Sequence, residues 1–173
     1  MKNMNKEMIQ EFLARLGSRS PKQATLYLLG GSALILLGSS RDTLDIDYVG
    51  NDMQKDDFQI LIEEIATELE LETEPVPIER FIPLPEGNEQ RKIHVGQFGN
   101  VDAYIIDPYS IALSKVDRGF ETDLEDIIFL VQHNQINMEE LEQIIKKSLS
   151  HAGKFDFHPE ILAHFEYLKK RLK

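Results

Sequence analysis

Apolar residues recur at helical spacing in two segments of the first half of the chain, and this periodicity predicts amphipathic helices. The first segment covers about residues 4–16, and Gly17 is expected to end its helix because glycine commonly follows a helix C-terminus. The second segment covers about residues 54–70. A shorter apolar helix is expected to begin at Ser32 and to close at Gly38.

Helix starts are marked by capping residues in the second half of the chain. Asp107 is a typical N-cap and Pro108 suits the first helical position, so a helix is predicted from here to Arg118, with Gly119 as its stop. Three further starts are predicted, at Thr122-x-x-Glu125 (a capping box), at Asn137-x-x-Glu140 and at His158-Pro159.

Strands are predicted where apolar residues run together or alternate with polar ones. Residues 25–29 (TLYLL) are typical of a buried strand, and residues 44–49 (LDIDYV) of a half-exposed one. Residues 92–98 and 101–106 are predicted to pair as a hairpin around Gly99-Asn100. The proline-rich stretch 74–88 is expected to be mostly extended or looping, with a short strand at 78–82 (IERFI).

These elements indicate a single α/β (α+β) domain over residues 1–173. Its mixed core covers about residues 24–130, and its helical C-terminal part covers about 137–173. The chain has no cysteine, which excludes disulfides and thiolate metal sites. Its longest apolar run, 26–38, is too short to cross a bilayer, and the N-terminus lacks the apolar segment of a signal peptide. A soluble, cytoplasmic protein with no membrane partner is therefore expected.

The formal net charge of −11 argues against duplex nucleic acid as a partner. An acidic surface repels a phosphate backbone, so bulk binding of duplex DNA is not expected. The charge still allows a small nucleotide neutralised by metal, or a focused basic pocket for one RNA end. It also favours a basic protein partner.

The segment LYLLGGSALILLGSSRDTLDIDYVG carries the candidate chemistry. Gly30 and Gly31 would let a phosphate approach the backbone at a helix start, and Ser32 adds a hydroxyl. The alternative reading of this motif is a tight turn. Asp45 and Asp47 alternate along a strand, so their carboxylates share one face about 7 Å apart. Paired carboxylates repel each other unless a cation holds them, and oxygen ligands suit Mg²⁺ or Mn²⁺.

Asp102 stands inside an otherwise apolar strand, where an unpaired carboxylate would be costly. If that strand pairs beside the strand of Asp45 and Asp47, three carboxylates converge. Such a triad can bind two metal ions that assist phosphoryl transfer. The alternative is an aspartate exposed on an edge strand. The five histidines are scattered without ligand spacing, so neither a zinc site nor a histidine base is expected.

The pattern GGSA, then R-x-T-x-D-I-D, then a later lone strand aspartate resembles the nucleotidyltransferase-fold superfamily that includes DNA polymerase β. Within it, the chain is most similar to bacterial abortive-infection and type IV toxin–antitoxin nucleotidyltransferases and their uncharacterised relatives. The resemblance covers about residues 24–130. It implies a mixed sheet flanked by helices, with Gly30, Gly31 and Ser32 cradling the triphosphate. It also implies Asp45, Asp47 and Asp102 as metal ligands, and Arg41 as a residue that helps to position phosphate or the loop.

The same families carry a downstream helical signature, which here would comprise Lys115, Arg118, Asp123 and Asp126. Lys115 and Arg118 lie three residues apart on one helix face, a spacing suited to phosphate charge. Their alternative role is local ion pairing on a solvated surface. The chain departs from the families at Thr122, where they usually carry a second basic residue.

Together these observations predict transfer of a nucleoside monophosphate from an NTP to a hydroxyl of an RNA end, a protein or a small molecule, with Mg²⁺ or Mn²⁺. The setting implied by the resemblance is a toxin–antitoxin or defence system. Two alternatives remain: a nucleotide-binding regulator or antitoxin that acts through a protein partner, and a structural α/β protein whose triad is coincidental.

Overall fold

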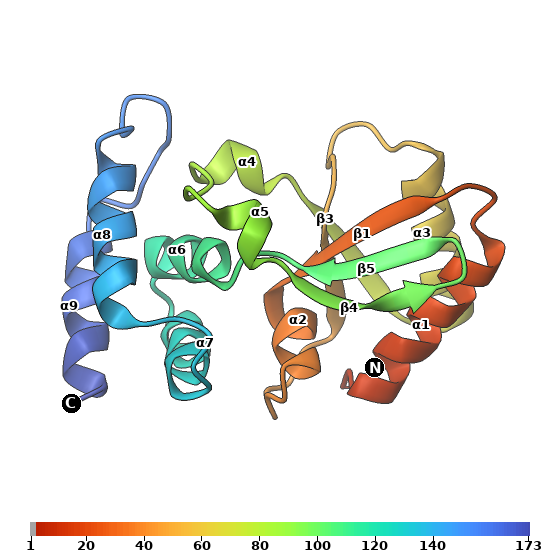
Figure 1. The fold of residues 1–173 in the computed structure, drawn as a ribbon, viewed down its shortest axis with the longest axis horizontal. Coiled ribbons are helices and arrows are strands. Elements are labelled where there is room, and N and C mark those ends of the chain that lie inside the picture. The colour runs from red at the N-terminus through yellow and green to blue at the C-terminus, as the bar shows by residue number, and fades with distance from the viewer. Residues whose placement is uncertain (1–2) are drawn as a thin grey trace. The chain divides into compact units, whose positions relative to one another are not determined.

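The computed structural model describes residues 3–173, which form nine helices and one five-stranded sheet (Figure 1). The chain divides into two compact units. Unit 1 contains the residues up to Pro77 together with Ile93–Ile106, and unit 2 contains Ile78–Lys92 and Asp107–Lys173. The predicted α/β class with a mixed sheet and C-terminal helices is confirmed.

Unit 1 holds the whole sheet, with strand order β3-β2-β1-β5-β4. The sheet is mixed because β1 runs parallel to β5 and antiparallel to β2, whereas β2 and β3 are parallel. Its elements are α1 (Lys6–Arg19), β1 (Ala24–Leu29), α2 (Gly30–Leu36), β2 (Asp45–Val49), α3 (Asp57–Glu68), β3 (Glu72–Val76), β4 (Ile93–Phe98) and β5 (Val101–Ile105).

Alternation along the strands gives the sheet two different faces. On one face Leu28, Ile46 and Ala103 are fully buried, and helices α1 and α3 pack against this side (Figure 1). On the other face the central strands present partly exposed polar and aromatic side chains, among them Asp47 and Tyr104. The candidate chemistry therefore lies on the polar face.

The sequence predicted that Gly17 ends α1, but Gly17 lies inside this helix. A Cβ at this position would stand 1.7 Å from the carbonyl oxygen of Phe98. The missing side chain thus lets α1 approach the β4–β5 turn, and this close approach explains the glycine. By contrast, Gly38 follows the end of α2 as expected, with φ of 106°.

The strand predicted at 78–82 is wrong, because Ile78–Phe81 form a short helix, α4. The strand lies just before it, at β3, and includes Pro75. β3 is an edge strand, with β2 as its one neighbour in the sheet. An edge position tolerates proline, since one side of the strand needs no backbone donor.

Unit 2 is helical, and its central helix α6 packs against α7, α8 and α9. The elements of unit 2 are α4 (Ile78–Phe81), α5 (Asn88–Arg91), α6 (Pro108–Arg118), α7 (Glu121–Gln132), α8 (Met138–Leu149) and α9 (Ile161–Arg171). The predicted core of residues 24–130 thus cuts across this grouping, since α6 and α7 belong with the C-terminal helices. Within residues 3–173, no helix combines the length and apolar character needed to cross a membrane.

The predicted caps of α6 and α8 are confirmed. The Asp107 carboxylate accepts the Tyr109 amide at 3.0 Å, and Asn137 accepts the Glu140 amide at 2.8 Å. The capping box predicted at Thr122 and Glu125 is wrong, because the N-cap of α7 is Phe120, two residues earlier. Helix α7 begins at Glu121, and its Asp123 carboxylate accepts the Phe120 amide at 3.3 Å.

Candidate functional site

The turn between β1 and α2 is built so that an acidic strand can lie directly beside it. Gly30 has φ of 69°, and a Cβ there would stand 2.0 Å from Oδ2 of Asp47. A Cβ at Gly31 would stand 2.8 Å from the Cβ of Thr43. The two glycines therefore make room for Asp47 and Thr43. Ser32 is completely buried, and its hydroxyl donates to the Leu29 carbonyl at 3.3 Å.

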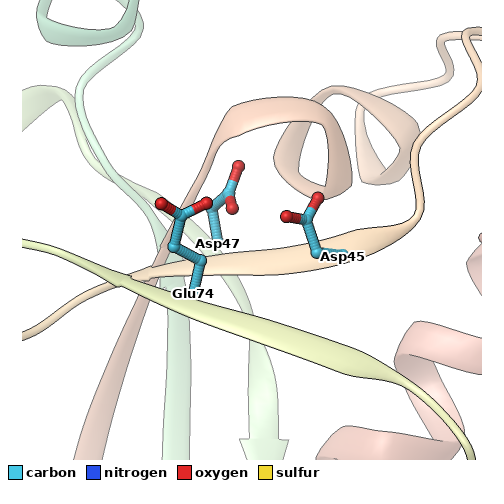
Figure 2. Close-up of side chains that lie close together, drawn as sticks. All are labelled: Asp45, Asp47 and Glu74. Carbon is cyan, nitrogen blue, oxygen red and sulfur yellow. The ribbon is translucent and has the colours of Figure 1, made fainter.

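Three carboxylates meet where β2 and β3 lie side by side. Asp45 and Asp47 share the polar face of β2, while Ile46 between them is buried in the core. In the parallel pairing of β2 with β3, Glu74 stands opposite Asp47. One oxygen from each of Asp45, Asp47 and Glu74 lies within 4.8 Å of the others (Figure 2). The predicted pair is thus brought together, with a glutamate as its third member.

The donor set of this acidic cluster (Asp45, Asp47 and Glu74) suits a divalent cation. Three carboxylates this close repel one another, and a bound cation relieves that repulsion. Carboxylate oxygens are the ligands that Mg²⁺ and Mn²⁺ prefer. The Thr43 hydroxyl donates to Oδ1 of Asp45 at 3.4 Å, which restrains one member of the cluster. The cluster can therefore bind a metal ion.

Asp102 does not join Asp45 and Asp47, because β5 pairs with β1 and β4 and not with β2. It stands opposite Thr25, whereas Asp47 stands opposite Leu29 at the other end of β1. Four residues of strand separate these positions by about 13 Å, in addition to the width of the intervening strand. Asp102 therefore does not converge with Asp45 and Asp47, contrary to the expectation from the sequence.

Asp102 instead belongs to a small polar group on β4 and β5. Its Oδ1 lies 2.5 Å from Nε2 of His94, and its Oδ2 accepts the Tyr104 hydroxyl at 3.1 Å. An unpaired carboxylate in an apolar strand would be costly, and these two contacts give the Asp102 carboxylate partners within the sheet.

The sequence did contain a signal for Glu74. The segment Glu72-Thr73-Glu74 repeats the alternation of acidic residues seen at Asp45-Ile46-Asp47, directly before Pro75. The prolines made this stretch resemble a loop, so the alternation was not interpreted as a strand.

Arg41 lies against the start of α2, and its expected role with phosphate stays a prediction. Its Nε stands 3.3 Å from the point where a Gly31 Cβ would be, and it donates to the Asp42 carbonyl at 3.3 Å. Beneath the cluster, burial raises the pKa of Tyr48, so its hydroxyl stays protonated at neutral pH.

Residues 5–173 match the model of a protein family described as "Nucleotidyltransferase of unknown function (DUF6036)". The chain belongs to this family. The match extends over both units, so the helical unit 2 is part of the family's architecture as well as the sheet. Searches among the curated proteins and among the solved structures found no match.

In this family member, Lys115 and Arg118 make ion pairs within unit 2. The Lys115 ammonium is buried, 2.8 Å from Asp126 and 3.7 Å from Asp123. Arg118 is 59% exposed and contacts Asp123 at 2.5 Å. The four residues of the downstream signature therefore form one ion-pair network that joins α6 to α7. A role for Lys115 and Arg118 at a nucleotide phosphate stays a prediction.

A second charged group ties α5 to α6 and α8. Arg91 donates to both carboxylate oxygens of the buried Asp107, at 2.7 and 2.6 Å, and this pairing raises the pKa of Arg91. The Tyr109 hydroxyl accepts the Asn137 amide and donates to Glu140. Sequence reasoning identified Asp107 as a cap and missed its salt bridge, because Arg91 lies 16 positions earlier.

Proposed function

We propose that this chain is a metal-dependent nucleotidyltransferase that transfers a nucleoside monophosphate from an NTP to a hydroxyl of an acceptor. The observation that carries the proposal is the acidic cluster beside the GGS turn, in a chain whose residues 5–173 match a family described as nucleotidyltransferases of unknown function. Phosphates and carboxylates would otherwise repel each other, so a site that binds both needs a cation between them.

Asp45, Asp47 and Glu74 would hold Mg²⁺ or Mn²⁺ in this proposal. A bound divalent ion supplies charge neutralisation for the phosphates and favours ionisation of an attacking hydroxyl. The protein's own part is to fix the carboxylates in place. Backbone pairing of β2 with β3 sets the position of Glu74, and Thr43 restrains Asp45.

The GGS turn and Arg41 would bind the phosphate chain of the NTP. Gly30 and Gly31 keep the backbone free of side chains at the point of closest approach to β2. Arg41 adds a guanidinium, which forms strong, charge-assisted hydrogen bonds to phosphate oxygens. Positive charge on one side and metal-bound carboxylates on the other would orient the triphosphate.

The acceptor of the proposed reaction is an RNA end, a protein side chain or a small molecule, and a toxin–antitoxin or defence setting would fit all three. A second candidate function rests on the net charge of −11. A strongly acidic protein is suited to bind a basic protein, so the fold would then act as a nucleotide-binding regulator or antitoxin.

Thermal melting of the full chain tests the proposal first. Each NTP is added with Mg²⁺, with Mn²⁺ or with EDTA, because a ligand that binds only the folded state raises the melting midpoint. We expect a metal-dependent rise that is absent in Asp45→Asn and retained in Asp52→Asn, a matched change at an exposed aspartate. Labelled NTP then reports transfer to candidate acceptors. A cooperative melt without any NTP-induced rise would overturn the enzyme proposal and favour a fold that serves to bind a protein partner without a nucleotide.

A further inference from the structure

Three aromatic rings lie in a row across the polar face of the sheet in unit 1. His94 on β4 stands opposite Tyr104 on β5, which stands opposite Tyr27 on β1. The ring centroids of His94 and Tyr104 are 4.9 Å apart, and those of Tyr104 and Tyr27 are 5.8 Å apart. The two tyrosine rings are inclined by 27°, so they stack. Tyr27 is the end of this aromatic row (His94, Tyr104 and Tyr27) on the side of β2.

The next two positions in the same row carry short aliphatic side chains. The β1–β2 register pairs Leu28 with Tyr48, and one further step places Val49 opposite Tyr27. Val49 in turn stands opposite Val76 on β3. Both valines are only partly buried. Beyond Tyr27, the row across the sheet therefore continues with two aliphatic side chains shorter than the aromatic rings.

The aromatic row lies one pleat away from the acidic cluster. Tyr27 precedes Leu29 by two residues, and Leu29 stands opposite Asp47. The separation along the strand is about 7 Å, and the side chains point to the same face. A nucleotide with its phosphates at the cluster and the GGS turn would extend its nucleoside part over this region of the sheet.

We propose that Tyr27 stacks on the base of the donor NTP, which lies over Val49 and Val76 and extends the aromatic row by one ring. This inference rests on the proposed function, since it assigns the base-binding part of the same site. A nucleobase is uncharged, so it suits an acidic surface that would repel the phosphate backbone of a nucleic-acid acceptor. The donor's phosphates would lie at the acidic cluster with the metal ion, so its uncharged base is the part that would reach these side chains.

Asp102 becomes a positioning residue in this arrangement. Its carboxylate contacts two members of the row, the outer His94 and the hydroxyl of the central Tyr104. It thereby fixes the orientation of the His94 and Tyr104 rings, and the Tyr104 ring stacks on Tyr27. Asp102, which the sequence singled out as a metal ligand, would thus support base binding through these rings and would not bind the metal.

Calorimetric titration of the full chain with ATP and with tripolyphosphate, both in Mg²⁺, separates base binding from phosphate binding. We expect Tyr27→Leu to weaken ATP binding about 10-fold, the scale of one base–aromatic stack, and to leave tripolyphosphate binding unchanged. Asp102→Asn should weaken ATP binding to a smaller extent, again without effect on tripolyphosphate. Tyr167→Leu, at a half-exposed tyrosine of α9, is the matched control, and melting curves check that each variant is folded.

Each other outcome is decisive. Equal affinity of wild type and Tyr27→Leu for ATP would overturn the inference, as would equal loss of ATP and tripolyphosphate binding in that variant. If wild type binds ATP no more tightly than tripolyphosphate, the base contributes nothing and the inference fails while the proposed function stands. If wild type binds neither ligand, both fail together.

Discussion

Gly30 and Gly38 stand at the two ends of α2, and both adopt positive φ angles, 69° and 106°. They differ in their surroundings, because a Cβ at Gly30 would collide with the Asp47 carboxylate whereas a Cβ at Gly38 would meet nothing within 4 Å. We expect Gly30→Ala to abolish metal-dependent NTP binding and to lower the free energy of unfolding by more than Gly38→Ala, which should cost about 1–2 kcal/mol of backbone strain alone.

Denaturant unfolding and melting with Mg²⁺ and NTP measure the two effects on the glycine variants. Gly38→Ala is the control, since Gly38 also has a positive φ but has no carboxylate beside it. Retention of the NTP-induced rise in Gly30→Ala would show that Asp47 can move aside without loss of the site, against this prediction.

Glu74 and Asp102 compete for the role of third metal ligand, and geometry separates them. Glu74 stands opposite Asp47, whereas Asp102 contacts His94 and Tyr104. We expect Glu74→Gln to weaken Mn²⁺ binding by more than about 10-fold, because outer-shell changes alone cost that much. Asp102→Asn should bind Mn²⁺ like wild type. Mn²⁺ titration without nucleotide, followed by electron paramagnetic resonance, measures both; the reverse ranking would restore Asp102 as the ligand.

The candidate site could be predicted from the sequence only where its members are close together along the chain. Gly30, Gly31, Asp45 and Asp47 follow from a local pattern, since alternation in one strand fixes which side chains share a face. The third carboxylate depends on strand order, which the local pattern does not contain. From the sequence, only Asp102 was predicted for this role, and the pairing of β2 with β3 gives the position to Glu74.

Helices α6 and α7 are joined by the buried ammonium of Lys115, which contacts Asp123 and Asp126. All three side chains are at most 6% exposed. Removal of the cation leaves two buried carboxylates without it, so we expect Lys115→Met to cost about 3–5 kcal/mol in the free energy of unfolding. Arg118→Met, at a side chain that is 59% exposed, should cost less than about 1 kcal/mol.

Denaturant unfolding of both variants tests the ion-pair network between α6 and α7. Their NTP affinity tests the prediction that Lys115 and Arg118 contact a nucleotide phosphate. If Lys115→Met unfolds like wild type, the buried ion pairs do not hold the two helices together. If Arg118→Met keeps its stability and loses NTP affinity, Arg118 acts at the nucleotide as the family resemblance implied.

Most elements were predictable where one local signal dominated. The cap of α6 at Asp107 and the hairpin β4–β5 are cases where the capping residue and the turn alone set the boundaries. Prediction failed where a distant contact outweighed local preference. Gly17 stays inside α1 because of Phe98, and β3 forms despite Pro75 because its other side is an edge.

The net charge of the whole molecule predicts how salt affects stability by screening, and this effect can be distinguished from metal binding at the acidic cluster. With 30 acidic and 19 basic side chains, the folded chain repels itself, and salt screens this repulsion over about 10 Å at 0.1 M. We therefore expect NaCl to raise the melting midpoint of wild type and of Asp45→Asn by similar amounts, because the variant removes one of many charges.

Magnesium should act differently on the same two proteins. At an ionic strength matched to the NaCl series, MgCl₂ should raise the midpoint of wild type further than that of Asp45→Asn, since a cation bound by the folded cluster stabilises that state by mass action. The difference between the two proteins measures binding at Asp45, Asp47 and Glu74, because screening is common to both. Identical responses to MgCl₂ would mean that the cluster does not bind Mg²⁺ without a nucleotide, and that the triphosphate itself must bring the ion.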